Sequence, residues 1–457
     1  MERMSTEIPI LYNEIKKEFN KAMANANGGE FVERPKTLSI LSKRKREFVQ
    51  NTRLQNKTSI EQLNKESDEL CDTYPISPSK AKDLILFSWI TEERLSNEGS
   101  VFNNKPFNFA LERYEISQKD KNLIESSSLA VIEELRNIGR ENLKDKLSFL
   151  PLNPVEEMFE NLNLSPNAAR LDYILTKKGP KLIEINSQWV DAISALSGFQ
   201  KVFGQTSEYK PIDVFSEIIN RKRVAIIDIN QSTAISKSTG AIEELNSLAR
   251  KLLNTRKPPV VCEVIDPEKT SLRYLNKFDY YYLNCDPRYF RFEIPDWLTY
   301  ITDKAKRGSA TIFPNWRPLL DKKYILSMMS NECIAPTTPL TKEAYLDCDS
   351  PLVLKGDGYS LNSVVTSFDS NFKEMLGYAM EEPNAYVVQP YIESVIINSW
   401  VFDTDKRKVK FLKDAFTKLN VWVLGNRVVG MLLTLSDSPL ISDKGYNCVP
   451  IFRKDNI

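Results

Sequence analysis

The sequence predicts a fold with α/β and α+β parts that follow a helical N-terminal region. Three observations carry this prediction. Apolar residues recur at helical spacing over much of residues 1–165. Apolar strand-like runs alternate with a helical stretch over residues 220–310, a pattern typical of a small parallel α/β unit. Short strand patterns fill residues 311–457, and a separate strand pair lies within residues 166–219, so these four ranges are the expected domains.

The N-terminal region contains the longest helical patterns. They cover Leu11–Met23, Ser59–Leu70, Pro78–Leu95 and Gln118–Ile138. A basic run, Lys43–Arg46, lies between the first two. It could contact a nucleic acid or an anionic ligand, but a solvated helix face is the more common role of such a run.

Composition excludes several classes of function. The 457 residues include 62 Lys+Arg and 61 Asp+Glu, and this balance argues against a bulk electrostatic grip on nucleic acid or membrane. The chain has no histidine, which excludes Ser-His-Asp and Cys-His nucleophiles and His-ligated zinc. Its six cysteines form no C-x-x-C pair and suggest reduced thiols. Without a long apolar segment or a signal-peptide pattern, we expect a soluble cytoplasmic protein.

The most informative stretch is a pattern of two short strands around a turn that ends at Gly179. Polar and apolar residues alternate on both strands, and side chains two residues apart share a face. A three-residue loop with Gly179 in the left-handed conformation would place Asp172 opposite Glu184 and Arg170 opposite Asn186. The pattern therefore predicts four polar side chains on one face of a hairpin.

These side chains suggest a magnesium and phosphate site. Asp172, Glu184 and Asn186 offer the hard oxygen ligands that Mg²⁺ prefers together with phosphate oxygens. Arg170 beside them suits a phosphate. A surface hairpin with its polar face in water would give the same pattern.

Two further segments could contact a nucleotide. A strand pattern ends at Lys355 and continues into a loop with Gly356, Gly358 and Ser360, in which backbone N–H groups and a lysine could bind phosphate. The loop is not a Walker A motif, and an ordinary β-turn would also explain it. A later strand pattern stops at Gln389-Pro390, where the Gln389 amide could contact an adenine ring; a buried strand and a turn is the alternative.

The parallel α/β unit suggests a second ligand position. Ligands of such units bind beyond the carboxyl ends of the strands, which here means near Asp228–Ser232 and Asp286. The small polar residues 232–239 and the segment 192–202, expected to be a helix or a lid loop, lie close to the predicted strands in sequence.

Taken in order, these segments resemble the circularly permuted ATP-grasp family, and within it the synthetase domain of glutathionylspermidine synthase. The resemblance covers roughly residues 165–453. The metal-binding strand pair precedes the lysine and glycine loop, as in the permuted group. The segments that carry it are Arg170-x-Asp172 with Glu184-x-Asn186, Pro314–Leu326, the Lys355 loop, Tyr386–Glu393, Val421–Gly430 and Leu440–Pro450.

The resemblance implies an ATP-grasp fold with a Rossmann-like pre-ATP-grasp unit at 220–310, and a site for ATP and Mg²⁺. Asp172, Glu184 and Asn186 would hold the metal ions, and Arg170 would stabilise an acyl phosphate. The phosphates would be reached by Lys355 and by Lys322 or Lys323, whose register is ambiguous. Gln389 and Tyr391 would lie at the adenine hinge.

Two departures from the family pattern bear on its activity. Thr434 stands where an arginine is expected, and Asn447 replaces a second arginine. The resemblance as a whole implies an ATP-dependent carboxylate–amine ligase. Its substrates would be small-molecule carboxylates and amines, or a peptide or carrier-bound acyl group. A degenerate ATP-grasp module that binds a nucleotide or a partner protein without catalysis is the alternative, and a nucleic-acid-binding protein is disfavoured by the balanced charge.

Overall fold

A computed structural model describes the chain from residue 61 onward, with gaps. The described residues are 61–98, 101–102, 105–112, 114–140, 143–150, 152–187, 193–203, 208–228, 241–284, 290, 292–341, 351–356, 364–439, 445–448 and 450–453. The basic run at Lys43–Arg46 lies outside them. Within these ranges no helix is long and apolar enough to cross a bilayer.

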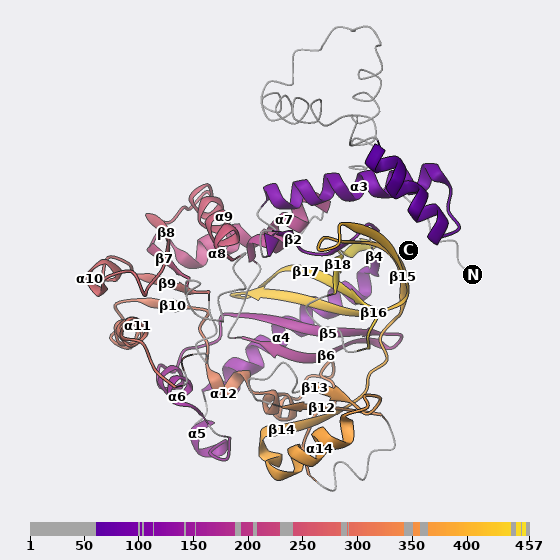
Figure 1. Cartoon of the computed structure of the whole chain (residues 1–457). Coiled ribbons are helices and arrows are strands. Elements are labelled where there is room, and N and C mark those ends of the chain that lie inside the picture. Colours follow the sequence, from indigo (N-terminus) through magenta and orange to yellow (C-terminus); the bar gives the residue numbers. More distant parts are fainter. Residues whose placement is uncertain are drawn as a thin grey trace, which may run out of the picture.

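The fold mixes α and β structure around a seven-stranded sheet (Figure 1). Neighbouring strands in this sheet are antiparallel except for one parallel pair, β3 and β18. In spatial order the strands are β15 (Ile397–Asp403), β3 (Phe109–Ala110), β18 (Tyr446–Cys448), β17 (Arg427–Ser436), β16 (Lys408–Leu424), β5 (Ala168–Thr176) and β6 (Gly179–Asn186). The hairpin predicted near Gly179 thus joins strands that lie more than two hundred residues later in the chain.

Helix α4 (Gln118–Gly139) covers one face of this sheet. Ser117 caps its start by accepting a hydrogen bond from the Asp120 N–H, 3.0 Å away. Its buried residues recur at helical spacing, and they pack against alternate residues of β5, β16 and β17, such as Leu171, Leu419 and Leu433. Because strand residues alternate between faces, the polar residues between these leucines must point to the opposite face.

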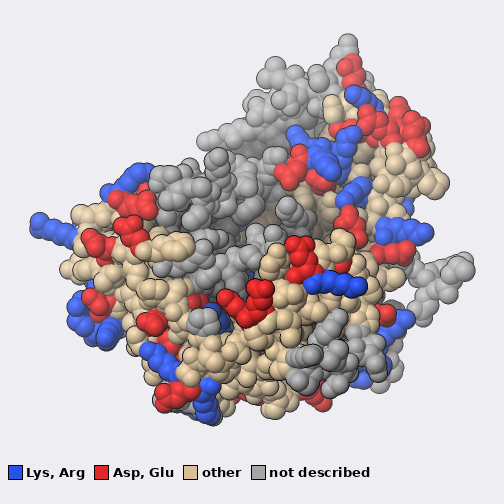
Figure 2. Space-filling model, turned by 60° about the horizontal axis from the view of Figure 1, so that its bottom comes forward, with Lys and Arg blue, Asp and Glu red and all other residues tan. Residues whose placement is uncertain are grey.

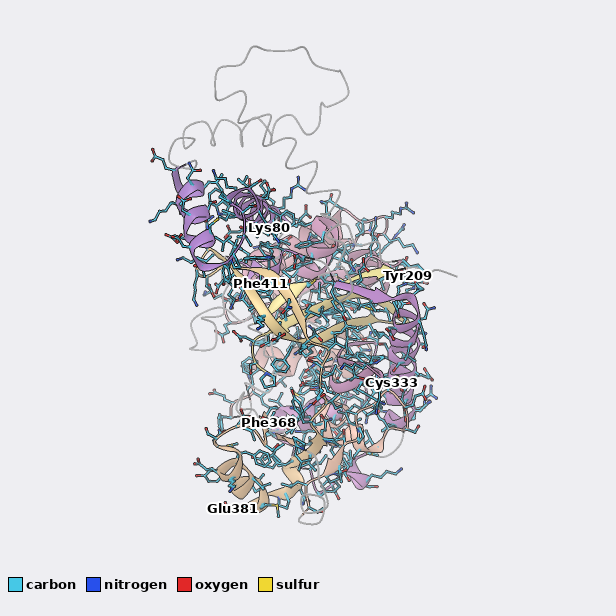
Figure 3. All side chains as sticks on the ribbon, turned by 90° about the vertical axis from the view of Figure 1, so that its right-hand side faces the viewer. Lys80, Tyr209, Cys333, Phe368, Glu381 and Phe411 are labelled. Atoms are coloured by element: carbon cyan, nitrogen blue, oxygen red, sulfur yellow. The ribbon has the colours of Figure 1, made fainter. Side chains whose placement is uncertain are left out.

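Other helices cover one end of that opposite face. These are α3 (Pro78–Asn97), α7 (Ile193–Phe203) and α8 (Pro211–Ile219), which pack on β16 and β17. The segment predicted as a helix or lid loop is therefore the helix α7. The ring of Trp400 on β15 packs against the rings of Tyr74 and Phe411, and Lys80 Nζ lies 5.9 Å from its centroid. Figure 3 labels Lys80 and Phe411 where α3 lies against the sheet.

The predicted α/β alternation forms a second, wholly parallel sheet at one side of the molecule (Figure 1). Its strands in spatial order are β10 (Thr311–Phe313), β9 (Tyr280–Leu283), β7 (Arg223–Ile227) and β8 (Val261–Ile265), with helices α9 (Ala241–Leu253), α10 (Leu272–Leu275) and α11 (Asp296–Lys306). The chain leaves β7 toward β8 and later returns to β9 on the other side. The sheet therefore has a topological switch point between β7 and β9.

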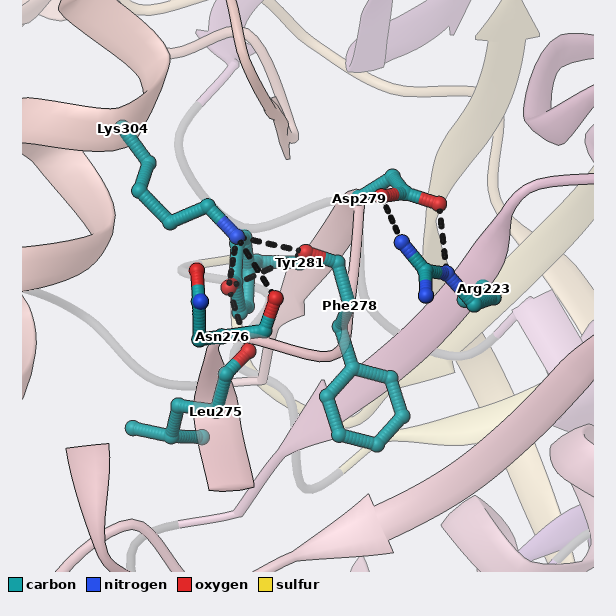
Figure 4. Close-up of polar contacts among 7 residues, drawn as sticks. All are labelled: Arg223, Leu275, Asn276, Phe278, Asp279, Tyr281 and Lys304. Carbon is teal, nitrogen blue, oxygen red and sulfur yellow. Dashed lines mark hydrogen bonds and ion pairs between the residues drawn. The ribbon is translucent and has the colours of Figure 1, made fainter. Parts of the chain in front are cut away.

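A buried lysine ties α11 to this sheet (Figure 4). The Lys304 ammonium donates to the carbonyls of Phe278 (2.9 Å) and Asn276 (3.2 Å) and lies 3.3 Å from the Tyr281 hydroxyl. The two carbonyls lie just after α10, so the lysine satisfies backbone groups that follow the end of a helix. Its role is structural.

A third sheet of four antiparallel strands lies on the opposite side of β6 from β5 (Figure 1). In order it contains β11 (Thr338–Pro339), β14 (Tyr386–Pro390), β12 (Leu352–Gly356) and β13 (Val364–Thr366). Helix α14 (Phe372–Glu381) packs on the face that bears Leu352, Leu354 and Val388. The other face bears Lys355 and Gln389 and is turned toward β6, because both side chains contact the Ile183 carbonyl of that strand.

Residues 61–73 are also helical. The remaining named elements are short. They are β1 (Val101–Phe102), β2 (Lys105–Pro106), β4 (Tyr114–Ser117), α5 (Leu143–Lys146), α6 (Pro154–Glu160), α12 (Pro318–Asp321), η2 (Lys323–Met328), η3 (Pro383–Ala385) and β19 (Pro450–Arg453).

Replacing Gly430 with alanine should destabilise the protein by about 1–3 kcal/mol, because α7 lies directly on β17 at this position. A Cβ atom there would lie 2.5 Å from Gln200 Nε2 and 2.8 Å from a methyl carbon of Leu196. Urea unfolding of Gly430→Ala would measure the loss. Gly377→Ala in α14 is the matched control, since its Cβ would meet nothing within 4 Å and alanine favours a helix. Equal stability of Gly430→Ala and the wild type would refute the close packing.

Candidate anion-binding site

The predicted hairpin is present, and its register at the polar residues is confirmed. Arg170 pairs with Asn186 and Asp172 with Glu184. The predicted loop is wrong, since Thr176 pairs directly with Gly179 and leaves a two-residue turn. The Thr176 hydroxyl stabilises this turn by accepting from the Lys178 N–H and donating to the Gly179 carbonyl.

A β-bulge at Ile183 restores the predicted register. Asp172 pairs with Glu184 but the next residue, Tyr173, pairs with Leu182, so Ile183 has no partner in β5. Its carbonyl instead accepts hydrogen bonds from Lys355 Nζ (2.8 Å) and, more weakly, Gln389 Nε2 (3.4 Å). The bulge thus provides a contact between the seven-stranded sheet and the third sheet.

Asp172 is the centre of the polar face of the seven-stranded sheet. Its side chain is fully buried, and its carboxylate oxygens lie 3.0 Å from Arg170 Nε and 3.2 Å from Lys418 Nζ. Burial raises the pKa of this carboxyl, but the charges of Arg170 and Lys418 outweigh burial and hold the pKa below its ordinary value of 3.8. Asp172 is therefore an anchor for two cations.

Glu184 and Asn186 remain as oxygen donors. Glu184 is partly exposed and makes no hydrogen bond or ion pair in the part of the chain described, and its charge acts on Lys355. The Asn186 Nδ2 atom is buried and has no hydrogen-bond partner among the described residues. A buried amide without a partner is uncommon unless a ligand or water satisfies it.

Lys355 brings a further positive charge to this face. Its side chain is buried, and burial lowers its pKa to about 8, with Glu184 and Asp172 opposing the shift and Lys323 and Lys418 adding to it. These mutual effects place four cationic and two anionic side chains close together: Arg170, Lys323, Lys355 and Lys418 against Asp172 and Glu184. The cluster has an excess of positive charge.

The structure separates the two lysines whose register was ambiguous. Lys322 forms an ion pair with Glu156 of α6, with its ammonium 3.0 Å from the carboxylate, and its side chain is buried there. Lys323 instead donates to the Gly356 carbonyl at the end of β12, 3.2 Å away. The geometry therefore favours Lys323, and not Lys322, as the second lysine beside Lys355.

The expected adenine-contacting residues lie along β14. Gln389 is buried and donates to the Thr337 hydroxyl at 2.8 Å as well as to the bulge carbonyl. The ring of Tyr391 packs edge-on against Phe368, a residue that is 61% exposed. Figure 3 labels Phe368. Gly358 and Ser360 lie outside the described residues, as do residues 232–239 and Asp286.

Lys418 is the site residue that the sequence prediction missed. It lies on β16 directly opposite Thr434, the position where the resemblance expects an arginine. Thr434 itself accepts a hydrogen bond from Asn420 and pairs in register with Asn447. The Lys418-x-Asn420 spacing repeats that of Arg170-x-Asp172, and this was the available signal. A cation is therefore present on this face despite the two departures, one strand away from its expected position.

A magnesium ion fits only part of the predicted ligand set. The described residues contain no group of three or more Asp, Glu, Cys or His side chains that could hold a metal. Asp172 has both oxygens in ion pairs, so in this arrangement it does not offer a free ligand. Glu184 and Asn186 can supply oxygens, and Mg²⁺ commonly takes few protein ligands when phosphate oxygens complete its shell.

The parallel unit places two carboxyl groups at the predicted strand ends. Asp228 follows β7 and Asp266 follows β8. Burial raises the pKa of Asp228 to about 6, and the nearby charge of Asp266 adds to the increase.

Positive and negative side chains are interspersed over the face of the molecule that Figure 2 displays.

The solved structures that this chain is similar to include two of low similarity. A glutathione synthetase-like effector from Globodera pallida, in apo form, has a TM-score of 0.49 and 10% identity, covering 81% of this chain and 97% of that chain. A protein provisionally named gamma-glutamylcysteine synthetase from Methylobacillus flagellatus KT has a TM-score of 0.33 and 13% identity, covering 65% and 81%. No family model matches the chain. No curated protein matches it either.

Proposed function

We propose that this protein is an ATP-dependent carboxylate–amine ligase that forms an amide through an acyl phosphate. The observation that carries the proposal is the cluster at the Ile183 bulge. There, Lys355 of the third sheet and Lys323 of η2 approach the face of the seven-stranded sheet that bears Arg170 and Lys418. Four cationic groups against two carboxylates complement a polyphosphate that is partly neutralised by magnesium.

Each residue has a proposed part in this reaction. Lys355 and Lys323 bind phosphate oxygens, and Gln389 and Tyr391 lie on the side of the base. Glu184 and Asn186 supply protein ligands to Mg²⁺, which would neutralise phosphate charge. Arg170 stabilises the oxyanion of the acyl phosphate, with a small-molecule carboxylate, a peptide or a carrier-bound acyl group as the acid and a small molecule as the amine.

A non-catalytic nucleotide-binding protein is the second candidate, and one observation favours it. The Asp172 carboxylate is saturated by Arg170 and Lys418, which leaves one fewer metal ligand than the hairpin pattern predicts. Such a protein would bind Mg–ATP but release no ADP with any carboxylate and amine.

Lys355→Met should remove most of the affinity for Mg–ATP, because a charge-assisted contact to phosphate would be lost from a buried position. We expect at least about a tenfold rise in Kd, which is about 1.4 kcal/mol. In thermal unfolding, Mg–ATP should raise the Tm of the wild type and raise that of Lys355→Met much less.

Lys181→Met is the control, since its ammonium lies on the same hairpin but donates to the Glu332 carbonyl. An equal Tm increase in Lys355→Met and the wild type would contradict the proposed site. ADP release that depends on both a carboxylate and an amine would exclude the non-catalytic candidate.

Affinity for inorganic tripolyphosphate should fall as the pH rises above about 8. Lys355 has a pKa of about 8 in the unliganded protein and loses its charge above that value. Phosphate binds the charged form, so binding must then also protonate the lysine. The measurement is the affinity for tripolyphosphate between pH 7 and 10, in the wild type and in Lys355→Met, which lacks the titrating ammonium. If the affinities of the two proteins change in parallel with pH, Lys355 does not contact the phosphate.

A further inference from the structure

Lys418 lies two strands away from the contact between the sheets. It belongs to β16, which pairs with β5, and β5 in turn pairs with β6. Since neighbouring strands are about 4.8 Å apart, the Lys418 backbone lies roughly 10 Å across the sheet from Ile183, where Lys355 makes its contact. Cationic side chains therefore lie on the polar face at two places, Lys418 on β16 and Lys355 beside β6.

The hydrogen bonding of the Lys418 ammonium is incomplete in the part of the chain that the structure describes. An ammonium has three N–H donors, and only the Asp172 carboxylate accepts from it there. The side chain is nevertheless only 10% exposed. Burying such a group with one partner is costly unless something else satisfies it.

A second orphaned donor lies near the same residues. Asn186 Nδ2 is buried without a partner, and Asn186 pairs in register with Arg170, two residues before Asp172. Arg170 and Lys418 already neutralise the charge of Asp172. The unsatisfied donors of Lys418 and Asn186 on this face therefore fit an additional anionic group.

We propose that Lys418 binds the terminal phosphoryl group of a nucleoside triphosphate, while Lys355 and Lys323 bind the inner phosphates; this rests on the proposed function. Asp172 is then a positioning residue that holds Lys418 and Arg170. In the transfer, a substrate carboxylate oxygen forms a bond to the γ-phosphorus as the bond to the β–γ bridging oxygen breaks. That electron pair leaves with ADP, and Lys418 stabilises the charge on the phosphoryl oxygens.

The test compares ATP with ADP, each with magnesium, by isothermal titration of the whole chain. Lys418→Met should weaken ATP binding at least tenfold and leave ADP binding within about twofold of the wild type. Lys418→Arg should retain most of the ATP affinity because it keeps the charge. Lys355→Met should weaken both nucleotides, which separates the two lysines.

Two results would overturn the assignment. The first is an unchanged affinity for ATP in a folded Lys418→Met variant. The second is an equal loss of affinity for ATP and ADP, which a merely structural role of Lys418 predicts. If Lys418→Met does not fold, the double variant Lys418→Met/Asp172→Asn removes both charges together and carries the same comparison. A wild type that binds neither nucleotide would reject the proposed function itself.

Discussion

Replacing Asp172 with alanine should destabilise the protein by about 3–5 kcal/mol, the cost of breaking a buried ion pair by removing one partner. Arg170 and Lys418 would remain in the sheet without their shared counter-charge, and the Lys418 side chain is only 10% exposed. Two-state urea unfolding would measure the loss, which appears as a lower midpoint at an unchanged slope.

The same carboxylate gives the stability a defined pH dependence. Because the pKa of Asp172 is lower in the folded state than its ordinary value of 3.8, its contribution is fully present above the pKa of the unfolded chain. It is lost as the pH falls below 3.8 and through the folded-state pKa. The difference in stability between the wild type and Asp172→Ala should therefore shrink over that range, and a constant difference would contradict the ion pairs.

Glu184→Ala is the matched control on the neighbouring strand. Its side chain is partly exposed and has no hydrogen bond or ion pair in the described part of the chain, so its removal should cost less than about 1 kcal/mol. We expect it instead to weaken the magnesium dependence of nucleotide binding. Similar stability losses in the two variants would mean that Asp172 has no special anchoring role.

Much of the polar face could be predicted from strand periodicity. The alternation of polar and apolar residues specifies which side chains share a face, and the pairing of Asp172 with Glu184 follows from this pattern. The prediction of the turn is wrong, yet the register at the polar residues is right because two differences from the prediction cancel. The loop is one residue shorter than expected, and the bulge at Ile183 adds the missing residue back.

The residues that the sequence misplaced depend on contacts between distant segments. Lys322 and Lys323 are equivalent in a sequence pattern, and only the packing of α6 against α12 pairs the first with Glu156. Lys418 appears in the sequence as one polar residue in a long strand. Its importance depends on β16 lying beside β5, a pairing between segments more than two hundred residues apart. Periodicity contains no information about such neighbours.

The ion pair between Glu160 and Arg317 should have an equally large effect on stability, with a consequence for the site. Glu160 accepts from the Arg317 guanidinium and from the Leu319 N–H, and both side chains are buried. Glu160→Ala should cost about 3–5 kcal/mol, because Arg317 would keep only the Gly139 carbonyl as a partner in the described region. Urea unfolding would measure it.

Glu217→Ala provides the comparison with an exposed pair. Its partner Arg427 is 39% exposed and Glu217 is 44% exposed, so the loss should stay below about 1 kcal/mol. The Glu160 pair also holds α12, and Lys323 begins η2 with one residue between it and the end of this helix. Under conditions where Glu160→Ala remains folded, we therefore expect weaker binding of tripolyphosphate than in Glu217→Ala. Equal affinity in the two variants would mean that the position of Lys323 does not depend on α6.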